Sequence, residues 1–197
     1  MIGPITWVGV ALDSGFDAVL AAARTGAPWA LAELYRDLHP AVLRYLKSQE
    51  PTEGEDIASE VWIDVAGALG RFEGHEPDFR RWVFTIARRR LIDTRRKRGR
   101  RRTDVAANER FAERAANLAH DPSTLIADRI TVEEATQRLR ALLPADQAEV
   151  IALRVLGGLD VNHVAEVMGK RPGTVRVLQH RALRRLAEAG WSRVVTK

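Results

Sequence analysis

Three carboxylates recur at a spacing of four residues in one segment of the chain: Asp56, Glu60 and Asp64. In a helix this spacing places all three side chains on one face. Hard divalent cations prefer oxygen ligands, so the pattern raises the hypothesis of a metal-dependent nuclease. No histidine stands at ligand spacing and no second carboxylate pair completes a cage. We therefore predict neither a metal nor a cofactor.

The same acidic face has two other interpretations. It is either a solvated helix surface or a docking surface for a basic protein. We favour the docking surface, because Val61 and Trp62 offer apolar anchors beside the acids and buried aromatic anchors dominate many interfaces.

A strongly basic strip follows the acidic segment. The chain of 197 residues carries 31 Lys and Arg against 26 Asp and Glu, a net charge of +5. Residues 80–102 hold twelve basic side chains and one acidic one, a local charge of +11, while the remainder carries −6. Such a strip is expected to meet a polyanion, whose phosphates neutralise it. Its far end, residues 98–102, is equally open to interpretation as a solvated tail.

Aromatic side chains interleave with the first half of the basic strip. Phe79, Trp82 and Phe84 share a predicted helix with Arg80 and Arg88. Exposed bases stack on aromatic rings, whereas a closed duplex hides them. This half of the strip therefore favours single-stranded or melted nucleic acid.

The C-terminal part of the chain carries a helix-turn-helix pattern. Ala165 lets a second helix approach closely, Gly169 suits the turn, and Val175 points back into a small core. Pro172 fits the first turn of that second helix. Its polar face carries donors suited to phosphates and major-groove base edges: Arg171, Thr174, Arg176, Gln179, His180, Arg181 and Arg184. A plain helical hairpin with a solvated basic face is the alternative.

Helical spacing of apolar residues almost throughout predicts an all-α fold. We expect two small helical domains, 14–98 and 123–191, joined by a flexible linker, 99–122, the C-terminal domain being the helix-turn-helix. Thr52 and Glu55 have the spacing of a capping box, and Pro40 predicts a kink or brief break in its helix.

Composition excludes several classes of protein. The chain contains no cysteine, which excludes a disulfide framework, a thiolate zinc site and a cysteine nucleophile. Its longest apolar run lies within residues 2–12, too short to span a bilayer and not preceded by a basic segment. We expect a cytoplasmic protein with no membrane insertion.

Three segments, in this order, resemble motifs of the extracytoplasmic-function (ECF) sigma factors of bacterial RNA polymerase. They are EDIASEVW at 55–62, FRRWVFTIAR at 79–88 followed by LID at 91–93, and LP at 143–144 with GTVR at 173–176. The resemblance covers nearly the whole chain, from about residue 16 to residue 187. Ser59, Arg89 and Ala148 depart from the residues that are common in the family.

The resemblance implies a protein without catalytic residues that gives RNA polymerase core, through its β′ clamp and β subunits, specificity for promoter DNA. The implied polymerase-binding residues are Asp56, Glu60, Val61, Trp62 and Asp64. The implied minus-ten residues are Arg71, His75, Arg80, Arg81, Trp82, Arg88, Arg89, Arg95 and Arg96. The polar face of the second helix in the helix-turn-helix would read the minus-thirty-five element.

An anti-sigma factor is implied as a further partner. A stand-alone helix-turn-helix regulator is the alternative to a sigma factor. It would explain Ala165, Gly169 and Val175 equally well, but not the aromatic and basic helix.

Overall fold

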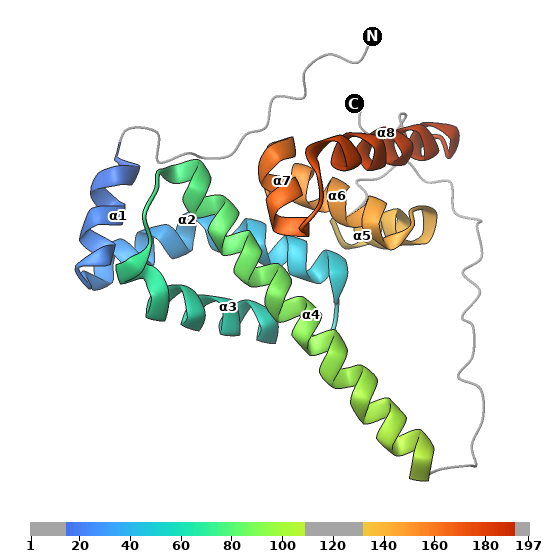
Figure 1. Cartoon of the computed structure of the whole chain (residues 1–197), viewed down its shortest axis with the longest axis horizontal. Coiled ribbons are helices and arrows are strands. Elements are labelled where there is room, and N and C mark those ends of the chain that lie inside the picture. Colours follow the sequence, from blue (N-terminus) through green and yellow to red (C-terminus); the bar gives the residue numbers. More distant parts are fainter. Residues whose placement is uncertain (1–14, 109–131, 192–197) are drawn as a thin grey trace.

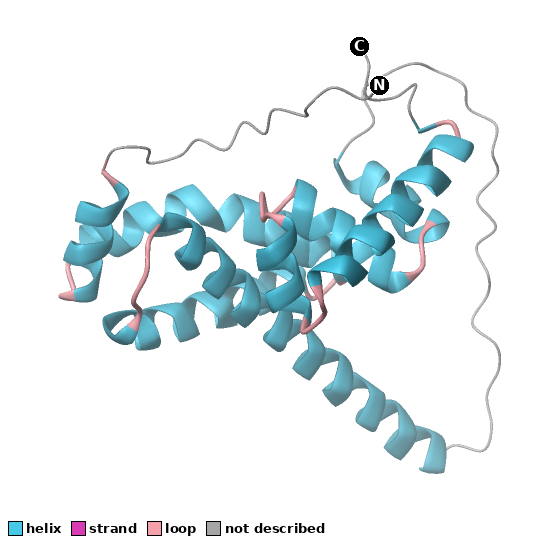
Figure 2. Ribbon diagram, turned by 45° about the horizontal axis from the view of Figure 1, so that its top comes forward, coloured by secondary structure: helices cyan, strands magenta, loops and turns pink. Residues whose placement is uncertain are grey.

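The computed structural model describes residues 15–108 and 132–191, and all regular elements in these ranges are helices (Figure 1 and Figure 2). The prediction of an all-α fold is confirmed. The apolar run at residues 2–12 lies outside the described residues. The first region consists of α1 (Phe16–Arg24), α2 (Pro28–Gln49), α3 (Gly54–Ala68), the 3-10 turn η1 (Leu69–Arg71) and α4 (Glu76–Asn108). The second consists of α5 (Val132–Leu142), α6 (Ala145–Val155), α7 (Val161–Met168) and α8 (Pro172–Glu188).

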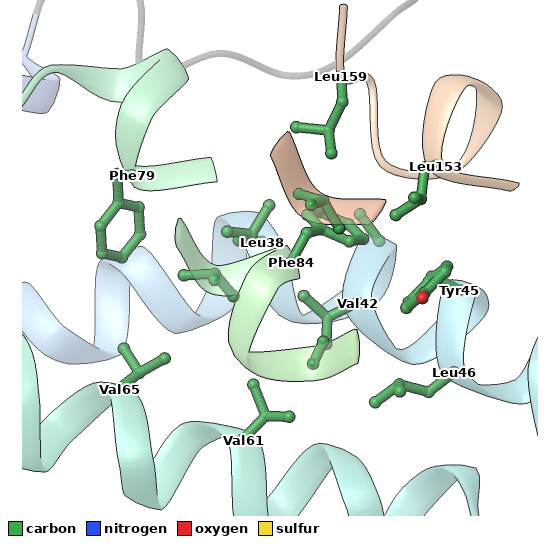
Figure 3. Packing of buried hydrophobic residues seen from close by; sticks show 14 of the residues in the cluster. Leu38, Val42, Tyr45, Leu46, Val61, Val65, Phe79, Phe84, Leu153 and Leu159 are labelled. Atoms are coloured by element: carbon green, nitrogen blue, oxygen red, sulfur yellow. The ribbon is translucent and has the colours of Figure 1, made fainter. Parts of the chain in front are cut away.

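Helices α2, α3 and α4 enclose the core of the first region. Helix α2 buries Leu34, Leu38, Val42 and Leu46 at intervals of four residues, as an amphipathic helix does. It runs without interruption through Pro40, so of the two alternatives expected there, a kink or a brief break, the break is wrong. Buried side chains on both sides of the proline hold the two halves against one core (Figure 3).

The start of α3 is fixed by close packing rather than by a capping box. Glu53 occupies the N-cap position and no side chain caps the helix. The carboxylate of Glu55 instead pairs with Lys47 Nζ at 2.7 Å. A Cβ atom on Gly54 would come within 3.0 Å of the backbone nitrogen of Lys47, so the glycine allows α3 to begin against the end of α2. The capping-box prediction from Thr52 and Glu55 is therefore wrong.

The second region contains the expected helix-turn-helix. Asp160 caps α7 by accepting a hydrogen bond from the backbone N–H of His163, and this bond lowers the pKa of its carboxyl group. Gly169 ends α7 in the left-handed conformation, with φ +63°, which favours glycine. Ala165 and Val175 are buried where α7 meets α8.

The two regions lie against one another. Helix α6 packs on α2, and α7 packs on α4. The C-terminal end of α4 extends beyond the other helices (Figure 1). Leu153 and Leu159 of the second region belong to the same buried cluster as Tyr45 and Phe84 of the first (Figure 3). A Cβ atom on Gly157 would lie 3.2 Å from the ring of Phe84, so the approach is close.

Helix α4 continues to Asn108, ten residues beyond the domain boundary expected at residue 98. The beginning of the expected linker, 99–108, is therefore helical, and 109–131 lie outside the described residues. Among the described helices, none has both the length and the apolar character needed to cross a bilayer.

Candidate protein and nucleic-acid interfaces

The acidic face of α3 is partly neutralised by a neighbouring arginine. Arg90 of α4 forms two hydrogen bonds with the carboxylate of Asp64 and a third, 3.1 Å long, with Glu60. The bonds from Arg90 lower the pKa of Asp64, and Asp64 raises the pKa of Arg90. Asp56 is exposed and forms no ion pair with a described residue.

The three carboxylates do not form a cation cage. Two of them face a guanidinium, and the described residues contain no cluster of three His, Cys, Asp or Glu side chains placed to hold a metal ion. This arrangement does not favour the nuclease hypothesis.

The exposed apolar side chain on this face is that of Ile63, not those of the two residues chosen from the sequence. Val61 is completely buried and Trp62 is only 8% exposed, with its ring 4.9 Å from that of Tyr35. The expectation that both present apolar side chains to a partner is wrong, because they complete the core. Ile63 is 71% exposed and follows Glu60 by three residues on the outward side. Ile63 lies off the i+4 stripe of apolar residues that contains Val61, and this position in the sequence already indicated an exposed side chain.

Two of the predicted minus-ten arginines, Arg80 and Arg95, hold α4 to α2 and its C-cap residue Glu50, and Arg98, which was not predicted, joins them. Arg80 pairs with Asp37 at 3.7 Å. Arg95 Nε and Arg98 Nη1 donate to the two oxygens of Glu50 at 2.8 and 2.7 Å. Burial alone would raise the pKa of Glu50, but the hydrogen bonds from Arg98 and Arg95 outweigh it and lower that pKa. These guanidinium groups therefore have structural partners.

Two further predicted minus-ten residues bond to the second region. Arg88 Nε donates to Oε1 of Glu149 on α6 at 3.0 Å, and the hydroxyl of Tyr45 donates to the same oxygen at 3.1 Å. Burial and then the nearby Glu149 raise the pKa of Tyr45 well above its ordinary value, which keeps the hydroxyl protonated. Arg81 Nη1 lies 3.1 Å from Glu166 of α7. The second region thus neutralises part of the basic face of α4.

Three of the minus-ten candidates, Arg71, Trp82 and Arg89, come together in one place. They line a pocket between α3 and α4 that Ile63 also borders. The ring of Trp82 is half-buried and lies 5.0 Å from that of Phe72 and 5.8 Å from that of Phe79, centroid to centroid. Arg71 and Arg89 are exposed and form no ion pair with a described residue.

The remaining two minus-ten candidates lie apart from this pocket. His75 is exposed in the loop before α4, with its Nδ1 atom 3.3 Å from Asp17. Arg96 is exposed and lines a second pocket, between α4 and α7, together with Arg89 and Val167. Helix α7 therefore partly covers the side of α4 on which Arg96 lies.

The polar face of α8 is open. Arg171, Thr174, Arg176, His180, Arg181 and Arg184 are exposed, and Gln179 is half-buried. Arg184 pairs with Glu188 of the same helix at 2.9 Å, and none of the other arginines in this set pairs with a described carboxylate. The position of α7 and α8 in the closed molecule leaves this face available to a duplex.

Both helical regions match family models. Residues 32–101 match sigma-70 region 2, and residues 133–186 match sigma-70 region 4. The chain therefore belongs to the sigma-70 family of RNA polymerase sigma factors.

Whole-chain relatives define the group within that family. The ECF RNA polymerase sigma factor SigD of Mycobacterium tuberculosis (strain ATCC 25618 / H37Rv) is 34% identical, over 87% of this chain and 82% of its own length. The ECF RNA polymerase sigma factor ShbA of Streptomyces griseus is 33% identical, over 82% of this chain and 87% of its own. The chain is an ECF sigma factor, as the three sequence motifs indicated, and the alternative of a stand-alone regulator is not supported.

Solved structures show the same fold. The sigma factor RpoE of Bartonella quintana, in complex with the anti-sigma factor NepR, is 26% identical with a TM-score of 0.61, covering 80% of this chain and 94% of that one. CnrH, in complex with the cytosolic domain of CnrY, is 21% identical with a TM-score of 0.60, covering 91% of this chain and 99% of that one.

Proposed function

We propose that this sigma factor acts in the cytoplasm, where it binds RNA polymerase core through the outward face of α3. The exposed side chain of Ile63, with Asp56 and Glu60 on the same face, carries this assignment. An apolar side chain surrounded by carboxylates has the composition of an interface centre with a charged rim. The carboxylates would steer a basic partner surface into register, and Ile63 would supply the apolar contact.

The pocket between α3 and α4 is the proposed site for the opened minus-ten strand. Arg71 and Arg89, neither of them in an ion pair with a described residue, supply positive charge at its rim beside Asp64 and Asp93, and the half-buried ring of Trp82 supplies a surface for stacking. Phosphate contacts and base stacking together suit single-stranded DNA. The exposed donors of α8 would address the minus-thirty-five duplex. The chain itself contributes no catalytic residue to RNA synthesis.

The closed arrangement occupies two further arginines of the predicted minus-ten set. Arg81 and Arg88 are bonded to Glu166 and Glu149 of the second region, so neither guanidinium is free for a phosphate. We propose that polymerase separates the two regions and holds them at the spacing of the two promoter elements. The free protein would then bind promoter DNA poorly.

An anti-sigma factor is the proposed inhibitory partner. The support is the likeness to the RpoE chain, which was solved with an anti-sigma factor bound. Such a partner would act by stabilising the closed arrangement or by covering the outward face of α3.

Transcription by core polymerase tests the assignment. Core with this protein should produce transcripts from a library of promoters with randomised upstream and minus-ten elements, and core alone should not. Asp56→Arg should abolish core binding while leaving the fold intact, because Asp56 is exposed and has no ion-pair partner among the described residues. Failure of the unaltered protein to bind core would overturn the proposal.

A further inference from the structure

Helix α8 turns one face toward its own region and the opposite face to solvent. Val175, Ala182 and Leu186 are buried on the inner face. Val177 follows Val175 by two residues, a rotation of about 200° around the helix axis. It therefore lies almost directly opposite the core, and its side chain is 49% exposed.

Basic and polar side chains flank Val177 on both sides. Thr174 and Arg181 lie on one side of it, at i−3 and i+4, and Arg176 and His180 lie on the other. Single exposed apolar residues are common on protein surfaces, so the exposure alone carries no argument. The position of Val177 is what matters: its apolar side chain occupies the centre of the face whose rim carries the donors.

Gly173 supplies a second, independent observation. It lies four residues before Val177 on the same outward face, in the first turn of α8. Glycine is a poor helix former, its φ here is not positive, and a Cβ atom would meet nothing within 4 Å. Nothing in the described part of the chain requires a glycine at this position. A surface that approaches the helix from outside would require one, because a missing side chain lets the backbone come close.

We propose that Val177 reads a thymine in the upstream promoter element by packing against its 5-methyl group. In the major groove, that methyl group is the apolar feature that distinguishes thymine, and small apolar side chains recognise it. Gly173 lets the start of α8 lie close to the base edges, where recognition helices make their contacts. The inference rests on the proposed function, in which α8 enters the major groove of the minus-thirty-five element.

Replacement of thymine by deoxyuridine removes only the methyl group and so tests the contact directly. Promoters are first selected from the randomised library with the complete holoenzyme, and each upstream thymine is then replaced in turn. At one position the replacement should weaken holoenzyme binding about fourfold, the factor expected for one buried methyl group. Val177→Ala should weaken binding to the thymine promoter and remove the effect of deoxyuridine at that position.

Two variants separate recognition from folding. Leu183→Ala is the matched control, because Leu183 is 43% exposed on α8 but lies about 120° around the axis from Val177. It should retain the deoxyuridine effect. Gly173→Ala should leave core binding unchanged and melt no earlier than the unaltered protein, yet bind the selected promoter less tightly.

The outcomes distinguish the two proposals. A selected upstream motif in which no thymine responds to deoxyuridine would overturn the role of Val177 alone, as would a response that persists in Val177→Ala. The absence of any selected upstream motif would overturn the proposed role of α8, and this inference with it.

Discussion

Arg88 and Glu149 form an ion pair between the two DNA-binding regions, with Arg88 Nε 3.0 Å from Glu149 Oε1 across 61 residues of sequence. The carboxylate is only 10% exposed and also accepts a hydrogen bond from the hydroxyl of Tyr45. The closed form therefore uses a guanidinium that the motif of the first region assigns to promoter DNA. Under the proposed function, closure and binding of the opened strand would compete for the same group.

Glu149→Gln should shift the protein toward an open form. The substitution keeps the size of the side chain but removes its charge, and a hydrogen bond to a charged group contributes about 1.5–3 kcal/mol. We expect a larger radius of gyration by small-angle scattering and tighter binding of the free protein to single-stranded minus-ten DNA. Glu188→Gln removes an exposed carboxylate that pairs only within α8, and it should change neither quantity. Unchanged scattering and affinity in Glu149→Gln would contradict the competition.

Ile63→Ala should weaken core binding, whereas Val61→Ala should destabilise the fold. Ile63 is exposed, so its truncation should weaken core binding with the melting temperature nearly unchanged. Val61 is completely buried, so its truncation should cost about 2 kcal/mol of unfolding free energy through lost packing. Fluorescence anisotropy with labelled protein measures the first effect, and denaturant unfolding measures the second. A loss of core binding in folded Val61→Ala that exceeds the loss in Ile63→Ala would reverse the assignment.

Glu50 should make stability fall on acidification. Its folded pKa lies below the ordinary value of 4.5, so the stabilisation is present above that pH and is lost as the pH falls through the lower, folded pKa. In a series of urea titrations, the unfolding free energy of the unaltered protein should therefore exceed that of Glu50→Gln at pH 6, and this difference should disappear as the pH falls to 3. Glu33→Gln is the control, because Glu33 belongs to a surface ion pair with Arg36 in α2, and such pairs contribute little. A constant difference between the unaltered protein and Glu50→Gln at every pH would contradict the assignment.

Local patterns made the helices and the helix-turn-helix predictable. Apolar periodicity depends on neighbours three and four residues apart, and the turn at Gly169 depends on one residue's backbone. The burial of Val61 was also predictable from the sequence, because it belongs to one i+4 stripe of apolar residues, Ile57, Val61, Val65 and Leu69. The same stripe leaves Ile63 on another face. The burial of Val61 and the exposure of Ile63 could therefore have been predicted from the same pattern.

The partners of the arginines were not predictable in this way. A count of charges treats residues 80–102 as one strip of +11. In the fold, carboxylates from α2, α3, α4, α6 and α7 neutralise part of it, over separations of up to 85 residues between Arg81 and Glu166. Six arginines of the strip have such partners: Arg80, Arg81, Arg88, Arg90, Arg95 and Arg98. Only tertiary packing decides which positive charges remain for DNA.

Arg176→Ala should distinguish base reading from phosphate binding on α8. Arg176 is exposed and forms no ion pair with a described residue, so its truncation leaves no buried charge behind. If it donates to a base edge, the variant holoenzyme should lose about 1–3 kcal/mol on the selected promoter and accept other bases at one upstream position. If it contacts a phosphate, all promoters should weaken equally and the slope of log affinity against log salt should fall by about 0.9. We expect the first result, because Arg176 stands beside Val177 in the first half of α8, where recognition helices reach the bases. Equal weakening on every promoter would contradict base reading and would show that Arg176 contacts the DNA backbone.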